Sequence, residues 1–106
     1  MPDMYTLVSS LEAKLPEIPP DSIVSRSIFQ DNTCKVILFG FSAGQELSEH
    51  TASKPAILHI LDGDAHLTLG DEKQDVSAGA WVYMQANVPH SVEAITRLIL
   101  LLVLLT

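Results

Sequence analysis

The chain has 106 residues, a length that a single hydrophobic core can serve, and 47% of its residues are hydrophobic against 18% charged. The composition excludes a disordered chain. The length leaves no room for a second domain with a core of its own. Thirteen acidic side chains against six basic ones give a formal net charge of −7, which repels phosphate backbones and anionic lipid surfaces. We therefore expect neither nucleic acid nor a membrane as a partner.

The N-terminal residues predict a short helix followed by an extended connector. Apolar residues recur at helical spacing, with Asp3 as a plausible N-cap. These residues are Met4, Leu7, Val8, Leu11 and Leu15. Pro16 ends the helix, and three prolines between residues 16 and 20 indicate an extended segment. We therefore divide the chain into a helix with its Pro-rich connector (1–20) and a β domain (21–106).

From residue 21 onward, short β-rich segments alternate with turn residues, which is typical of a sandwich or barrel. The predicted strands run over 23–29, 34–41, 46–50, 56–61, 65–69, 74–76, 81–84, 90–94 and 97–104. Asp62-Gly63 is the strongest hairpin signal, because Asp-Gly tolerates the positive φ of a tight turn. We expect the strands on either side of it to pair.

Two of the predicted strands, 56–61 and 97–104, are apolar on both faces, although a sheet with one solvent-exposed face needs apolar residues on only one. The apolar tail 98–105 is too short for a bilayer span, which needs about twenty such residues. A second copy of the chain is the simplest partner that would bury the outer apolar surface of these strands, so we expect a homodimer.

Two observations bear on the cellular compartment. The first fifteen residues lack a basic start followed by an unbroken apolar segment, so no secretory signal is indicated and we expect a cytoplasmic location. Cys34 is the only cysteine, which excludes an intrachain disulfide. Its apolar neighbours indicate a buried small residue rather than a nucleophile.

The segment from Gly44 to Ala94 resembles the two sequence motifs of the cupin superfamily. Gly44 and His50 are separated by five residues, Gly63 follows at the spacing of the first motif, and Gly79 precedes His90 at the spacing of the second. The resemblance implies an all-β double-stranded β-helix, or jelly-roll barrel, here preceded by a short N-terminal helix. It also implies a dimer and an interior metal site.

The departures from these motifs fall on the family's metal ligands. Ala52 replaces the second histidine of the first motif, and Ala56 replaces its glutamate. Of the four ligands that the resemblance implies, only His50 and His90 remain. A catalytic metal usually has three protein ligands, so two histidines are one short.

His59 is a possible further nitrogen ligand. It has the opposite strand parity to Ala56, so only a bulge would turn it inward, and a packed histidine on an apolar strand is the alternative. His66 lies on the polar face of its strand, and we expect it to be exposed.

The strand before His90 offers candidates for the wall of a ligand pocket. Aromatic, thioether and amide side chains there could hold a small molecule, although such residues are also ordinary core or turn residues. The candidates are Trp81, Tyr83, Met84 and Gln85.

Two functions remain open from the sequence. In the first, His50 and His90 hold a divalent ion (Zn, Ni, Mn or Fe) in an enzyme; many relatives are dioxygenases or isomerases. In the second, the barrel binds a small molecule without chemistry, which the missing ligands at Ala52 and Ala56 favour. The sequence assigns no catalytic residue and no substrate.

Overall fold

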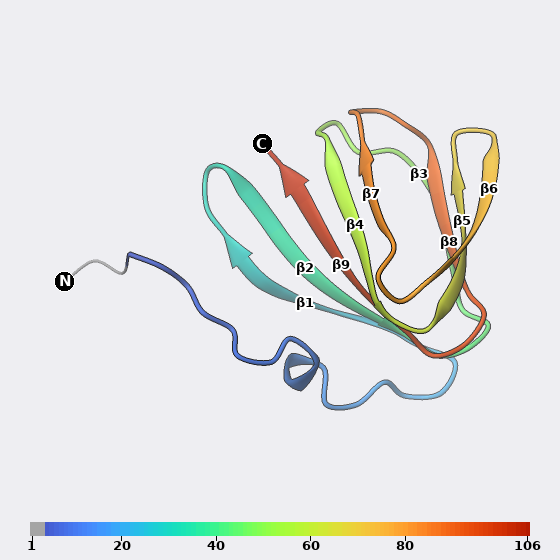
Figure 1. Cartoon of the computed structure of the whole chain (residues 1–106), viewed down its shortest axis with the longest axis horizontal. Helices are drawn as coiled ribbons and strands as arrows, with labels where there is room; N and C mark the ends of the chain where they lie inside the picture. Colours follow the sequence, from blue (N-terminus) through green and yellow to red (C-terminus); the bar gives the residue numbers. More distant parts are fainter. Residues whose placement is uncertain (1–3) are drawn as a thin grey trace.

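The computed structural model describes residues 4–106, which form two antiparallel sheets packed face to face (Figure 1). The five-stranded sheet has the order β1-β2-β9-β4-β7, and the four-stranded sheet has the order β3-β8-β5-β6. The strands are β1 (Ile23–Gln30), β2 (Cys34–Phe41), β3 (Glu46–His50), β4 (Ala56–Asp62), β5 (Asp64–Leu69), β6 (Glu72–Ser77), β7 (Trp81–Met84), β8 (His90–Ala94) and β9 (Leu98–Leu105). The predicted all-β class is confirmed, and four of the nine strands have the predicted bounds.

The main core lies between the two sheets. Side chains alternate along each strand, so every second residue points toward the opposite sheet. In β4 these are Ala56, Leu58 and Ile60, each at most 4% exposed. Leu67 of β5 and Val92 of β8 meet them from the four-stranded sheet. The apolar tail of the sequence belongs to the same core, because β9 is the central strand of the five-stranded sheet.

The predicted pairing of the strands around Asp62-Gly63 is wrong. β4 pairs with β7 and β9, whereas β5 pairs with β6 and β8, so both edges of each strand are taken by other partners. Gly63 instead forms a corner between the two sheets, with φ +96°. A Cβ at this position would lie 2.0 Å from the backbone oxygen of Arg97, which only glycine avoids.

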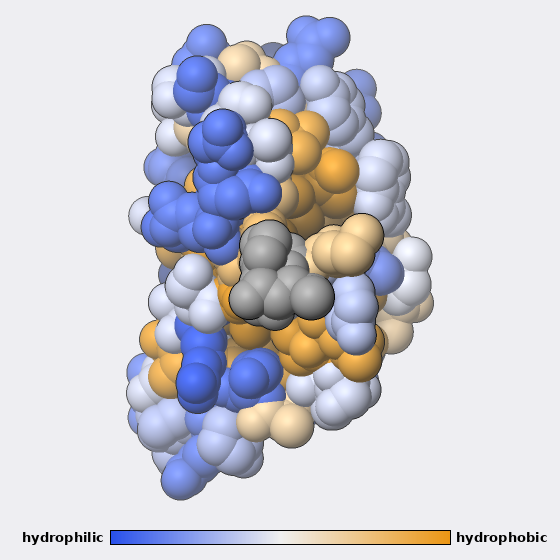
Figure 2. Space-filling view, turned by 90° about the vertical axis from the view of Figure 1, so that its left-hand side faces the viewer, coloured by the Kyte–Doolittle hydropathy of each residue, from blue (hydrophilic) through white to orange (hydrophobic). Residues whose placement is uncertain are grey.

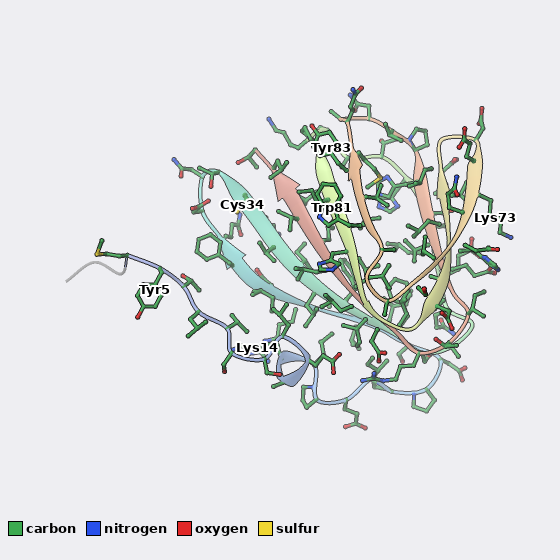
Figure 3. The ribbon with its side chains drawn as sticks, in the orientation of Figure 1. Tyr5, Lys14, Cys34, Lys73, Trp81 and Tyr83 are labelled. Atoms are coloured by element: carbon green, nitrogen blue, oxygen red, sulfur yellow. The ribbon has the colours of Figure 1, made fainter. Side chains whose placement is uncertain are left out.

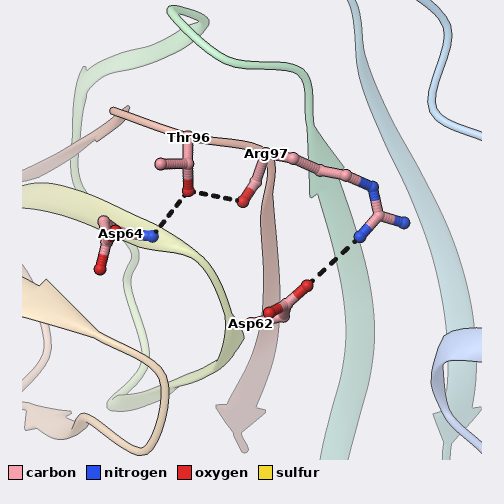
Figure 4. A network of polar contacts seen from close by, with 4 residues as sticks. All are labelled: Asp62, Asp64, Thr96 and Arg97. Carbon is pink, nitrogen blue, oxygen red and sulfur yellow. Dashed lines mark hydrogen bonds and ion pairs between the residues drawn. The ribbon is translucent and has the colours of Figure 1, made fainter.

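Polar contacts hold this corner to the turn before β9 (Figure 4). The backbone N–H of Asp64 donates to Thr96 Oγ1 at 3.0 Å, and the Thr96 hydroxyl donates to the Arg97 carbonyl at 2.9 Å. The Arg97 guanidinium lies 3.4 Å from Asp62 Oδ2. The turn chemistry that resembles a hairpin in sequence therefore joins two layers of the fold.

The predicted N-terminal helix is also wrong. Within residues 4–20 the structure has one 3₁₀ turn, η1 (Glu12–Lys14), and the predicted cap Asp3 lies outside the described residues. Met4 and Leu7, which the helix would have buried, are 94% and 77% exposed. A helix of about twelve residues is marginal without tertiary packing along its whole face, and only its C-terminal end packs here.

That end forms a second, smaller core on the outer face of the five-stranded sheet. Leu15 covers Leu38 of β2 and Ile99 of β9, and all three are buried. Gly40 leaves the space for this contact, because a Cβ there would lie 2.6 Å from the side chain of Ile18. Within residues 4–106 no helix is long and apolar enough to cross a membrane.

Candidate ligand site between His50 and His90

The two candidate histidines meet at the start of the β3–β8 pairing. His50 is the last residue of β3 and His90 is the first residue of β8, and they are direct partners in the antiparallel register. Their ring centroids lie 4.1 Å apart, with the planes tilted by 59°. The register of the β3–β8 pair shifts between Leu47 and His50, so β3 is irregular just before this contact. The structure therefore brings together the two rings that the sequence singled out.

Each imidazole makes a hydrogen bond to a backbone carbonyl through its Nδ1 atom. His50 Nδ1 lies 2.9 Å from the carbonyl oxygen of Ser48, and His90 Nδ1 lies 2.9 Å from the carbonyl oxygen of Val88. A carbonyl only accepts a hydrogen bond, so each Nδ1 carries the proton. In the neutral ring Nε2 then keeps its lone pair, and the site has two nitrogen acceptors.

The two rings line a small cavity at the edge of the main core. His90 is buried, with 6% of its surface exposed, whereas His50 is exposed. The cavity has a volume of about 20 Å³, which is room for about one water molecule. Its other lining residues are all apolar: Phe39, Leu47, Leu58, Val92, Leu100 and Leu102. Strand alternation would have identified these inward residues, but only the packing shows that they surround the histidines.

The loops beside the cavity are tied together by backbone contacts. The N–H of Asn87 donates to the carbonyl of Ala52 at 2.8 Å, which joins the segment after β3 to the segment after β7. Asn87 has φ +69°, a conformation that asparagine tolerates better than most residues. The N–H of Gly70 donates to the carbonyl of Pro89 at 2.8 Å, directly before His90.

The donor set does not fit a catalytic metal centre. Among residues 4–106 no group of three or more His, Cys, Asp or Glu side chains is placed to hold a metal ion. Ala56 is buried in the main core and supplies no ligand atom. His50 and His90 therefore offer two nitrogens where such a centre needs three protein ligands.

His59 lies on the opposite face of the sheet from these rings. Its neighbours Leu58 and Ile60 point into the core, so strand alternation turns His59 outward, beside Trp81 of β7 and Leu101 of β9. The bulge that would have brought it inward is absent between Ala56 and Ile60. His66 lies on the outer face of the other sheet, partly exposed and paired with Asp75.

Two of the predicted pocket residues point away from the cavity. Trp81 and Tyr83 are 59% and 51% exposed, and Figure 3 shows both side chains projecting from β7 on the side away from the four-stranded sheet. The reason is strand alternation: Val82 and Met84 face the core, so Trp81 and Tyr83 face the other way. Met84 packs in the main core without lining the cavity, and Gln85 is exposed beyond the end of β7.

Solved structures of the same shape support this architecture. A conserved protein of unknown function from Streptococcus pyogenes has 27% sequence identity and a TM-score of 0.82, over 98% of this chain and 92% of that one. A cupin superfamily protein from Desulfitobacterium hafniense has 25% identity and a TM-score of 0.82, over 99% and 94%. Salicylate 1,2-dioxygenase from Pseudoaminobacter salicylatoxidans has 15% identity and a TM-score of 0.74, over 83% of this chain and 26% of that one, and this likeness shows the fold alone.

None of the curated proteins matches the sequence. The family model described as the cupin domain matches residues 37–104, which include both histidines and the central strands of both sheets. The chain therefore belongs to the cupin family.

Proposed function

We propose that this protein is a non-catalytic binding module whose His50 and His90 accept hydrogen bonds from a small molecule. The observation that carries the proposal is the Nδ1–carbonyl contact of each ring, which leaves one Nε2 acceptor on each of two rings whose centroids lie 4.1 Å apart. Two acceptors favour a ligand that donates, such as a hydroxyl or amino group.

The size of the cavity limits what enters it. A volume of about 20 Å³ accepts a single hydroxyl or amino group, not a whole metabolite. The rest of the ligand would lie outside, next to the exposed ring of His50. The other lining residues are apolar and lower the local dielectric, which strengthens a hydrogen bond formed inside the cavity.

The proposal is tested by nuclear magnetic resonance on protein labelled with ¹⁵N in its histidines. Phenol and catechol serve as probes, since each presents hydroxyl donors on a small apolar frame. We expect both to shift the Nε2 signals of His50 and His90, and the Nδ1–H form to persist in both rings. His59 and His66, which lie on the outer faces, are the internal controls and should not respond.

Matched variants complete this test. His50→Ala and His90→Ala should abolish the stabilisation by catechol in a thermal-shift assay, whereas His59→Ala should retain it. The proposal fails if catechol stabilises the His50→Ala, His90→Ala double variant as well as the parent protein, or if neither probe shifts either ring.

A divalent-metal enzyme is the second candidate. One observation favours it: imidazoles that bind metals commonly donate their other N–H to a carbonyl, as His50 and His90 do. Against it stands the lack of a third protein donor among residues 4–106. Purified protein should then contain near-stoichiometric Zn, Ni, Mn or Fe that the double variant loses. Metal-free protein whose histidine signals ignore all four ions would exclude this candidate.

A further inference from the structure

We propose that the groove between the N-terminal segment and the β1–β2 hairpin binds a small organic cation, an amine attached to an apolar frame. The groove has a volume of about 560 Å³, which lies in the range of small-molecule sites. It lies on the outer side of the five-stranded sheet, whereas His50 and His90 line a cavity between the two sheets. The proposal is therefore independent of the ligand site described above.

A bulge in β1 supplies two of the apolar residues of the groove. The register of the β1–β2 pair shifts between Ser27 and Phe29, so Ile28 is the extra residue of the strand. At a bulge two residues of one strand oppose a single residue of the other, and both can face the same side. Ile28 and Phe29 both line the groove beside Val36, and all three are half-buried. A regular strand would have turned one of the two toward the inner face.

The N-terminal segment forms the opposite wall of the groove. Val8 and Leu11 contribute apolar side chains there, and Thr6 contributes a hydroxyl. Leu11 also packs against the small outer core around Leu15, which fixes one end of this wall. Figure 2 faces this side of the molecule and shows hydrophobic residues gathered on it, with hydrophilic residues along one border. These surfaces suit the apolar frame of a ligand.

The charge in the groove selects the class of ligand. Asp31 is the only charged side chain among the described residues that line it. The Thr33 hydroxyl and the N–H groups of Thr33 and Cys34 all donate to Asp31 Oδ1, so none of these three contacts uses Oδ2. The same contacts, the Thr33 hydroxyl first, lower the pKa of the carboxyl, which is ionised at neutral pH. A carboxylate beside an apolar surface favours a ligand whose ammonium group can pair with it.

The net charge of the chain favours the same class of ligand. A charge of −7 attracts cations toward the surface and repels carboxylates and phosphates. A fatty acid or a nucleotide would bring a second negative charge to Asp31, and a neutral apolar molecule would gain no ion pair there. An amine on an apolar frame matches both the charge and the lining of the groove.

The experiment compares three probes that share a phenyl ring on a four-carbon chain: 4-phenylbutylamine, 4-phenylbutanol and 4-phenylbutyrate. Each is titrated into the full chain, and binding is followed through the backbone N–H signals in nuclear magnetic resonance spectra. We expect the amine to shift the signals of Ile28, Phe29 and Val36. It should bind about fivefold more tightly than the alcohol, and the carboxylate should bind most weakly.

Asp31→Asn tests the ion pair, because it removes the charge and keeps an oxygen that accepts the hydrogen bonds of the turn. The affinity for the amine should fall about fivefold, to that of the alcohol, whose own affinity should not change. Asp71→Asn is the matched control. Asp71 is also exposed, lies in the turn between β5 and β6 outside the groove, and its substitution changes the net charge equally. It should leave the affinity for the amine within about twofold of the parent.

Thr6→Lys tests the same charge from the opposite wall. Thr6 is exposed and lies outside both cores, so this variant should fold even if circular dichroism shows that Asp31→Asn does not. The added ammonium group should weaken binding of the amine by about fivefold and strengthen binding of 4-phenylbutyrate.

Three results would overturn the proposal. The first is an amine that leaves the signals of Ile28, Phe29 and Val36 unchanged, including one that shifts only those of His50 and His90. The second is equal affinity for the three probes, which would make the groove a site for apolar molecules without selection of charge. The third is an effect of Asp31→Asn and Thr6→Lys no larger than that of Asp71→Asn, which would reduce the preference to the net charge of the whole molecule.

Discussion

The outer faces of the two sheets differ in polarity. The four-stranded sheet presents Glu46, Glu93, His66 and Asp75 in one cross-strand row, and these side chains are solvated or paired. The five-stranded sheet presents mainly apolar side chains on its outer face, as in the row of Val36, Val103, Ile57 and Tyr83. Both sheets use their inner faces for the same core, so the difference lies only in what the second face meets.

This difference shows that the larger sheet is apolar on both faces, whereas the smaller one has a polar outer face. A sheet that alternates apolar and polar residues needs one cover, whereas one that is apolar on both faces needs two. The N-terminal segment supplies part of the second cover through Leu15, which is 7% exposed. The comparison predicts that equivalent changes have unequal effects on the two outer faces.

The largest difference is expected between Leu38→Ala and Thr68→Ala. Leu38 is fully buried on the outer face of the five-stranded sheet, so its truncation should lower the free energy of unfolding by about 2–5 kcal/mol. Thr68 faces outward from β5, and its truncation should change stability by no more than about 0.5 kcal/mol. Urea unfolding of both variants measures the two values. Equal losses would show that the outer faces do not differ as described.

A smaller effect is expected for the ion pair on the polar face. His66 and Asp75 are direct partners across β5 and β6, but the Asp75 side chain is 83% exposed. A double-mutant cycle with His66→Ala and Asp75→Ala should give a coupling of about 0.2–1 kcal/mol that decreases with added salt. A coupling above this range that persists in high salt would mean that the polar face is covered by something the chain alone does not supply.

The smallest effect concerns a polar turn at the end of the five-stranded sheet. Three groups donate hydrogen bonds to the Asp31 carboxylate and lower its pKa below the ordinary value of 3.8. The Thr33 hydroxyl has the largest effect, and the N–H groups of Thr33 and Cys34 come next. The stabilisation from a lowered pKa is complete above pH 3.8 and is lost as the pH falls through the lowered pKa. Thr33→Val should therefore raise the pKa of Asp31 toward 3.8, as measured by carboxyl ¹³C titration. An unchanged pKa would assign the shift to the backbone donors.

The strands of the fold could be predicted closely from the sequence. Residues 34–41 and 90–94 form strands with the predicted bounds, because turn residues mark their ends and alternation marks their faces. The candidate pair His50 and His90 was also recognisable, because motif spacing preserved both positions. Local patterns of this kind need no knowledge of the rest of the chain.

The failures all involve a choice between partners. Asp62-Gly63 has the chemistry of a hairpin, yet it joins two sheets because β9 and β8 occupy the edges beside it. Trp81 and Met84 had to face opposite ways, but the sequence did not say which of them would face the core. The predicted N-terminal helix does not form, because only the end of its apolar face near Leu15 packs against the sheet.

The sequence by itself determined the all-β class, the positions of the strands and the loss of the family's other metal ligands at Ala52 and Ala56. Only the tertiary structure decided that His50 and His90 share one small apolar cavity with both Nε2 atoms free of the backbone. It also decided which face of the larger sheet remains open. The physical reason is range: strand formation depends on neighbours two residues apart, whereas pairing and covering depend on which distant strands compete for the same edge or face.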